Sequence, residues 1–154
     1  GHWRGIHTEA NSMNFDIDQL DETSETSYRV VVGRNPDVDG APGEDAGFLI
    51  VGPNSTQFQD VEREISVLNL LQAEKRKRAL DLGNAEDARL FVDGNADRRE
   101  LLVKRCTIGW FGLKQNGQDA DFTPANLDRV LKSRPAWVKR IAGEIETLSN
   151  FDKG

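Results

Sequence analysis

The chain has 154 residues, a length typical of one domain, and 37% of them are hydrophobic. Its 20 basic and 26 acidic side chains give a formal net charge of −6, which disfavours general binding to nucleic acid or to an anionic membrane. No apolar run approaches the roughly 20 residues of a membrane span. The single cysteine, Cys106, excludes an internal disulfide framework and is typical of a reducing cytosol.

The first twelve residues differ in character from the rest and precede the only methionine, Met13. We interpret residues 1–12 as an expression leader, and both histidines lie in it. The remaining chain then lacks the commonest general base and the commonest transition-metal ligand. Residues 13–27 are acidic and polar, which predicts a flexible lead-in, and residues 28–151 form the predicted single domain.

Two short strands are predicted before the first helix. Residues 28–33 and 47–52 are rich in β-branched and apolar side chains, and turn-forming residues fill 35–44 between them. This order predicts a β-hairpin, which needs a helix to cover it. The covering helix is predicted to begin near Thr56, because Thr56 and Gln59 have the spacing of a capping box. Its apolar stripe consists of Phe58, Val61, Ile65, Leu68, Leu71 and Gln72.

That helix is expected to run to about Leu80, with a stop at residues 83–84. Residues 84–95 fit either a short strand or a helical turn. Asn95 is the predicted N-cap of the next helix, which ends at residues 109–113.

The last third of the chain carries clear turn and helix signals. An Asn-Gly pair at 116–117 marks a turn, and Thr123 is the predicted cap of a helix with Pro124 at its first position. Pro135 ends this helix, and a last one follows to about 150–151. The predicted fold is α+β, mainly α, with an N-terminal two-stranded β-hairpin packed on about four helices.

Few residues suggest chemistry. Asn35, Asp37 and Asp39 match the first half of a calcium loop, but its twelfth position is Ala46 instead of glutamate, so an ordinary acidic hairpin loop is favoured. Cys106 is interpreted as a packing residue. We expect no catalytic residue, no metal site, no cofactor and no enzymatic activity.

A basic run of four residues, 75–78, is predicted at the end of the first helix. Consecutive helix positions fan out by ~100° each, so these side chains surround the helix instead of lining one face. They are typical of a solvated last turn that complements the helix dipole. An acidic protein partner and nucleic acid are the alternatives.

Three stretches, taken in order, resemble the tail assembly chaperones of phages with long, non-contractile tails. The first is the strand-to-helix passage 47–55, followed by a charged helix. The second is a helix that runs into residues 108–113 and then a turn at Gly117. The third is Phe-Thr-Pro-x-Asn-Leu at 122–127, continuing through Pro135 to a terminal Asn-Phe pair. The motif residues expected to fix the fold are Gly109, Trp110, Gly112, Thr123, Pro124, Pro135 and Phe151. Of these, Gly109 and Gly112 are expected to admit the indole of Trp110 closely.

The resemblance implies a phage or prophage protein of the bacterial host's cytoplasm. Such chaperones bind the tape measure protein, a very long and largely helical chain, keep it soluble and help tail tube protein polymerise around it. Self-association is also expected, since one copy cannot coat a long chain; nucleic acid and membrane are not expected partners. In many of these phages a ribosomal frameshift adds a C-terminal extension, and a chain ending at Gly154 would be the short product.

A partner helix would lie in an apolar groove between helices, with charged residues setting its register. The candidate contacts lie on the helix 60–78 and on the last helix: Arg76, Arg78, Trp137, Arg140, Ile141 and Glu144. A structural tail or head–tail connector protein is the first alternative, and it should persist in purified particles. A small DNA-binding regulator that uses residues 75–78 is the second, and salt-dependent retention on DNA would favour it.

Overall fold

The computed structural model describes residues 16–18 and 26–152. The interpreted leader, 1–12, and most of the acidic lead-in lie outside these described residues. In chain order the elements are β1 (Ser27–Arg34), β2 (Asp45–Val51), α2 (Thr56–Arg76), α3 (Ala85–Cys106), β3 (Thr107–Phe111), β4 (Lys114–Gln115), β5 (Gln118–Asp119), α4 (Pro124–Ser133), α5 (Pro135–Ile145) and the 3-10 helix η3 (Leu148–Phe151).

The strands β1, β2 and β3 form one antiparallel sheet with β2 at its centre, and β4 pairs with β5 in a separate ribbon. β1 and β2 pair as predicted, from Ser27 opposite Val51 to Arg34 opposite Asp45. The expectation of a simple two-stranded hairpin is wrong, because β3 adds a third strand with Trp110 opposite Phe48. β2 is a continuous apolar run, typical of a strand that is hydrogen-bonded on both sides, and β3 is rich in β-branched and aromatic side chains.

The two long helices begin one residue or more away from their predicted caps. Ser55 caps α2, because its side chain accepts from the amide of Phe58; the capping box predicted at Thr56 and Gln59 is absent, and the Gln59 amide donates to a backbone carbonyl instead. α2 ends at Arg76, followed by Lys77 in the left-handed conformation (φ 63°). Asn84 caps α3, so residues 84–95 belong to a helix, and Asn95 lies inside it.

Most of the C-terminal predictions are confirmed, but the last helix is shorter than predicted. The Asn-Gly turn joins β4 to β5, with φ angles of 54° and 79° at its two residues. Thr123 caps α4 through the amide of Asn126, and Pro124 takes the first helical position, where a missing amide costs no hydrogen bond. Pro135 separates α4 from α5. α5 ends at Ile145, so the last residues form a 3-10 turn instead of a longer α-helix.

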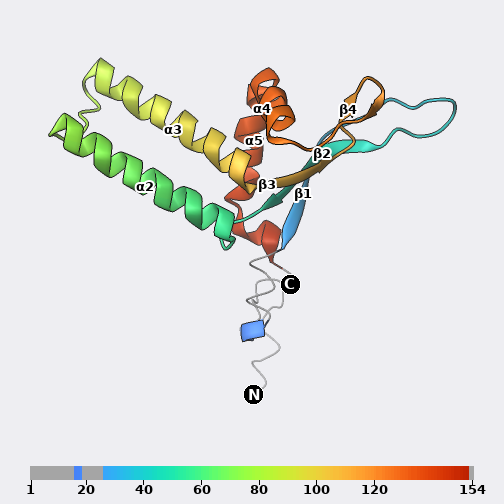
Figure 1. Cartoon of the computed structure of the whole chain (residues 1–154), viewed down its shortest axis with the longest axis horizontal. Coiled ribbons are helices and arrows are strands. Elements are labelled where there is room, and N and C mark those ends of the chain that lie inside the picture. Colours follow the sequence, from blue (N-terminus) through green and yellow to red (C-terminus); the bar gives the residue numbers. More distant parts are fainter. Residues whose placement is uncertain (1–15, 19–25, 153–154) are drawn as a thin grey trace, which may run out of the picture.

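The core lies between the sheet, the base of α3 and α5. Its members include the fully buried Phe48, Ile50, Leu102, Ile141 and Ile145. η3 closes it, because Phe151 packs edge-on against Tyr28 and directly over Gly52. From this body α2 and α3 extend side by side as an antiparallel hairpin (Figure 1). Among the described helices, none combines the length and apolar character needed to cross a bilayer.

Candidate protein-binding surfaces

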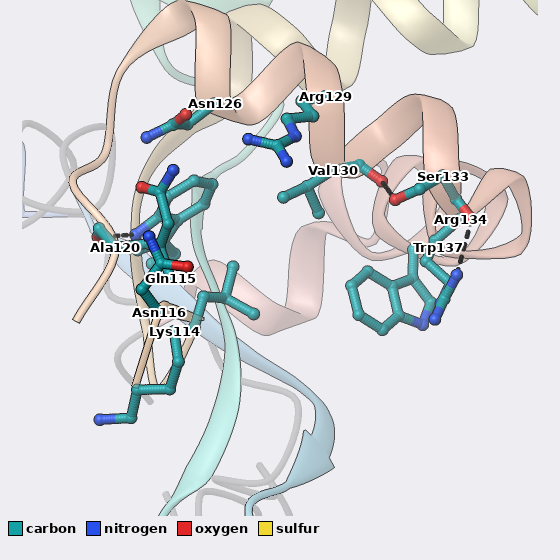
Figure 2. A pocket seen from close by; sticks show the side chains of 12 residues that line it. Lys114, Gln115, Asn116, Ala120, Asn126, Arg129, Val130, Ser133, Arg134 and Trp137 are labelled. Carbon is teal, nitrogen blue, oxygen red and sulfur yellow. Dashed lines mark hydrogen bonds between the residues drawn. The ribbon is translucent and has the colours of Figure 1, made fainter. Parts of the chain in front are cut away.

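Two surfaces stand out, and the first is a cleft of about 420 Å³ between the β3–β4 segment and helices α4 and α5 (Figure 2). We call it the tryptophan cleft. Its lining residues are Trp110, Leu113, Lys114, Gln115, Asn116, Ala120, Asn126, Arg129, Val130, Ser133, Arg134 and Trp137.

Both indoles of the tryptophan cleft are held in place by the core. Trp110 Nε1 donates to the carbonyl of Ala120 at 2.8 Å, and the ring packs edge-on against Phe122 at a centroid distance of 5.2 Å. The buried Phe48 ring contacts Trp110 and Trp137, at centroid distances of 6.3 and 6.0 Å. The cleft therefore has preformed aromatic walls.

The charged side chains of this cleft are all basic. Lys114 is paired with Asp119 and Glu44, at 2.5 and 2.6 Å, and these bonds raise its pKa. Arg134 donates to the Ser133 carbonyl at 2.9 Å and stands 5.8 Å from the centre of the Trp137 ring. The side chain of Arg129 makes no hydrogen bond or ion pair with the described part of the chain.

The second surface is the far half of the α2–α3 hairpin, residues 66–97, which we call the hairpin tip. In this stretch Asp87 is the only buried residue. Yet eight of the thirteen large hydrophobic side chains that are exposed among the described residues lie here: Val67, Leu68, Leu70, Leu71, Leu82, Leu90, Phe91 and Val92. This concentration of exposed apolar groups makes the hairpin tip a candidate interaction surface.

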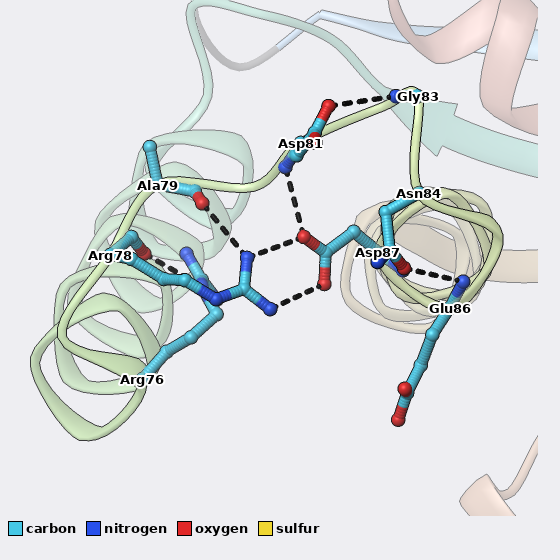
Figure 3. A network of polar contacts seen from close by, with 8 residues as sticks. All are labelled: Arg76, Arg78, Ala79, Asp81, Gly83, Asn84, Glu86 and Asp87. Atoms are coloured by element: carbon cyan, nitrogen blue, oxygen red, sulfur yellow. Dashed lines mark hydrogen bonds and ion pairs between the residues drawn. The ribbon is translucent and has the colours of Figure 1, made fainter.

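An ion pair between the exposed Arg78 and the buried Asp87 holds the loop of the hairpin tip (Figure 3). The guanidinium of Arg78 donates to both carboxylate oxygens of Asp87, one of them at 3.0 Å, and the amide of Asp81 donates to the same carboxylate at 2.9 Å. The bond from Arg78, with that amide, lowers the pKa of Asp87 to about 2. Because Asn84 caps α3 in the same loop, both helix ends are tied together before any partner binds.

Ion pairs also join the hairpin to the body. Arg98 on α3 donates to Glu62 on α2 and to Glu146, which directly follows α5. Arg105 pairs with Glu64 across the two helices at 3.1 Å. The hairpin is therefore anchored at its base and at its loop, with the apolar side chains between them.

The apolar side chains of α2 divide into two groups. Val61 is fully buried and Ile65 half-buried, so the first half of the predicted stripe packs against the body as expected. Leu71 at the far end of the stripe is 62% exposed. Leu68 and Val67 lie three and four residues from it and are also exposed, so the three share one side of the helix.

The two predicted contact residues of the basic run, Arg76 and Arg78, are bonded within the loop of the hairpin tip. Arg78 is held by Asp87, and the Nε of Arg76 donates to the Arg78 carbonyl at 2.8 Å. Lys77 is paired with Glu74. Two of the four basic side chains are thus neutralised by carboxylates of the hairpin, which weakens the case for a nucleic-acid surface there.

The predicted contacts on α5 do not form one surface. Ile141 is fully buried, so it belongs to the core and is withdrawn as a contact residue. Glu144 accepts from the side chain of Asn150 at 2.9 Å and so ties α5 to η3. Arg140 is exposed, and Trp137 lines the tryptophan cleft. None of these four lies in the hairpin tip (Figure 1).

The structure requires glycine at only one of the two motif glycines, and not for the predicted reason. Gly112 has a φ of +73°, and a Cβ there would lie 2.1 Å from the carbonyl oxygen of Asp45. It is thus the backbone of β2, and not the indole of Trp110, that demands glycine. A Cβ at Gly109 would make an ordinary contact of 3.4 Å with Leu49.

Sequence reasoning missed Asp87, Arg98 and the apolar hairpin tip. The usable signals were the Asn-x-x-Asp spacing that ends at Asp87 and the three consecutive apolar residues 90–92. Cys106 is buried, as expected of a packing residue, and burial raises its pKa to about 12. Within residues 16–18 and 26–152 no group of three or more acidic, His or Cys side chains is placed to hold a metal ion.

Comparisons of the chain with protein-family models, with curated proteins and with solved structures find no match. The two surfaces above therefore carry the functional argument.

Proposed function

We propose that this chain is a tail assembly chaperone that holds apolar helical segments of a tape measure protein on its hairpin tip, in the cytoplasm of a bacterial host. The observation that carries the proposal is the row of exposed apolar side chains over residues 66–97, beside a well-packed body. The motif resemblance supplies the identity of the partner, and the hairpin supplies the surface.

The chemistry of the hairpin tip suits a helical partner. A pair of antiparallel helices leaves a groove along each open side, and an amphipathic helix laid into such a groove completes a three-helix arrangement. Leu68 and Phe91 are 44% and 47% exposed, so each is half covered by the hairpin and half open to a partner. Their burial would stabilise the complex by about 25 cal/mol for each Å² of apolar surface removed from water.

The arrangement also suits work on a long chain. The Arg78–Asp87 pair preorganises the loop of the tip, so this loop needs little further ordering when a partner binds. Because the surface is narrow, many copies would coat one tape measure protein, and the body of each copy would remain free to recruit tail tube protein or a neighbouring copy.

The test is co-expression of the full chain with the tape measure protein of the same genome, measuring how much tape measure protein is soluble and co-purifies. Val92→Glu places a charge on the hairpin tip, and Val38→Glu is its matched control, because the two valines are 63% and 61% exposed. Glutamate is a good helix former, so α3 itself is preserved. We expect Val92→Glu to reduce recovery about tenfold or more, equivalent to 1.4 kcal/mol of binding free energy, and Val38→Glu to leave it unchanged.

Equal recovery with both folded variants would contradict a role for the hairpin tip. Mass spectrometry of purified virions decides between the chaperone and a connector protein. Recovery of this chain in stoichiometric amounts from finished particles would favour the structural alternative.

A further inference from the structure

We propose that the tryptophan cleft binds an acidic peptide segment of a protein partner, taking one apolar side chain between its indoles and the carboxylates of the peptide on Arg129 and Arg134. This inference stands apart from the hairpin tip, which lies on other elements of the fold (Figures 1 and 2).

The walls of the tryptophan cleft are apolar and fixed. Trp110 and Trp137 both rest on the buried Phe48 ring, and Val130 and Leu113 are half-buried hydrophobic residues packed against the same core. A volume of about 420 Å³ falls in the lower part of the range for ligand sites and has room for one or two side chains. Because the walls do not need to form, an entering side chain gains contact area without ordering them.

The rim of the tryptophan cleft selects for negative charge. The molecule as a whole carries −6, yet the lining residues include no aspartate or glutamate. Lys114 is already satisfied by two carboxylates, whereas Arg129 and Arg134 pair with no carboxylate of the described residues. Two guanidinium groups beside an aromatic surface offer bidentate hydrogen bonds to carboxylates, and in a chain of acidic character this is a local reversal of sign.

The shape of the cleft favours a peptide over single-stranded nucleic acid. A nucleic-acid groove needs a basic track over several nucleotides. In the tryptophan cleft only Arg129 and Arg134 lack a carboxylate partner among the described residues, and the net charge of −6 repels a phosphate backbone. The exposed amides of Gln115 and Asn116 on the opposite rim provide donors and acceptors for a peptide backbone. Figure 2 shows Arg129 reaching over the cleft from α4, opposite these amides.

The test measures binding of a fluorescein-labelled heptapeptide, acetyl-Asp-Asp-Phe-Asp-Glu-Leu-Asp-amide, to the full chain by fluorescence anisotropy. The test variant is Arg129→Gln with Arg134→Gln. The control is Arg63→Gln with Lys139→Gln. It also removes two positive charges, but from exposed positions that do not line the cleft. Thermal unfolding confirms that both double variants are folded.

We expect salt-dependent binding by the unmodified chain, a loss of at least tenfold in the test variant and less than twofold in the control. A peptide with serine in place of phenylalanine and leucine should bind at least tenfold more weakly. Equal affinity of the two double variants, no preference for the apolar side chains, or no binding by the unmodified chain would each overturn the proposal. Tighter binding of a ten-nucleotide oligothymidylate would overturn it in favour of nucleic acid.

Discussion

Gly112 and Gly117 have nearly the same backbone conformation, with φ angles of +73° and +79°, but different surroundings. A Cβ at Gly112 would collide with the Asp45 carbonyl oxygen at 2.1 Å, whereas nothing lies within 4 Å of a Cβ at Gly117. Gly117→Ala should therefore lower the free energy of unfolding by about 1 kcal/mol, because alanine is strained in the left-handed conformation. Gly112→Ala should lower it by about 2 kcal/mol more, because the collision with Asp45 is added. Urea denaturation of the two variants measures the difference. Equal losses would mean that the sheet yields at Asp45 without strain.

The Arg78–Asp87 pair predicts a pH dependence confined to the hairpin loop. The pKa of Asp87 is lowered from its ordinary value of 3.8 to about 2, so the stabilisation is complete above about pH 4 and is lost as the pH falls toward 2. The bond to Asp87 raises the pKa of Arg78, which therefore keeps its charge throughout this range. The backbone amide of Asp81 donates to the same carboxylate, so the NMR chemical shift of this amide should follow the protonation of Asp87.

We expect that shift to titrate with a midpoint near pH 2 in the unmodified chain and to lose this transition in Asp87→Asn. In the variant the amides of residues 78–84 should exchange with solvent about tenfold faster at neutral pH. A midpoint near 3.8 in the unmodified chain would show that the ion pair does not form in solution.

Among the described elements, the α2–α3 hairpin carries most of the ion pairs, and Arg98 joins three segments at its base. Its bonds to Glu146 and to Glu62 raise its pKa and link α3 to α5 and α2. Both carboxylates are more than 40% exposed, so solvent screens the pairs and their contribution is modest. Arg98→Met should lower the free energy of unfolding by about 1–2 kcal/mol, because the apolar stem remains while the charged bonds are lost.

Arg99 is the matched control for this prediction. It is half-buried on the same helix and has no ion pair with the described residues, so Arg99→Met should change the free energy of unfolding by less than about 0.5 kcal/mol. The difference between the two variants should shrink in 1 M NaCl, measured by urea denaturation. A difference that is insensitive to salt would assign the loss to packing instead of charge.

Comparison of the predicted and observed elements shows which features local sequence rules can predict. The strands β1 and β2, the Thr123 cap and the Pro135 break follow from propensity, turn and cap chemistry within a few residues, and the structure confirms them. The sequence pattern predicts a helix end at residues 109–113, where the structure has strand β3. Its partner strand β2 lies about sixty residues away in the chain, and local rules do not predict pairing over that distance.

The candidate surfaces were harder to predict than the elements. The apolar stripe of α2 correctly groups residues on one side of the helix, but periodicity does not say how far the body reaches along it. Val61 is covered and Leu71 is not, and this difference arises from tertiary packing that the helical period does not encode. The tryptophan cleft is built from residues of β3, α4 and α5, so only the tertiary fold shows that its two arginines lie beside the same aromatic surface.

At the scale of the whole molecule, burial divides the chain into a packed body and a weakly supported hairpin tip. Leu102, Val103 and Cys106 at the base of α3 are fully buried, whereas in residues 66–97 only Asp87 is. Local opening is cheap where few apolar contacts are lost. Amides of the tip, apart from those at the loop ion pair, should therefore exchange on the order of 100-fold faster than those of residues 100–106 on the same helix.

Hydrogen exchange followed by mass spectrometry measures this difference in the free chain. A second measurement repeats it with the partner bound. Addition of tape measure protein should slow exchange over residues 66–97 while leaving the loop 35–44, which lies on the opposite side of the body, unchanged (Figure 1). Such selective protection is expected because a bound helix would bury the side chains whose exposure makes opening cheap. Uniform exchange along α3 in the free chain would contradict the division itself. Protection confined to the body would leave the division intact and move the partner away from the hairpin.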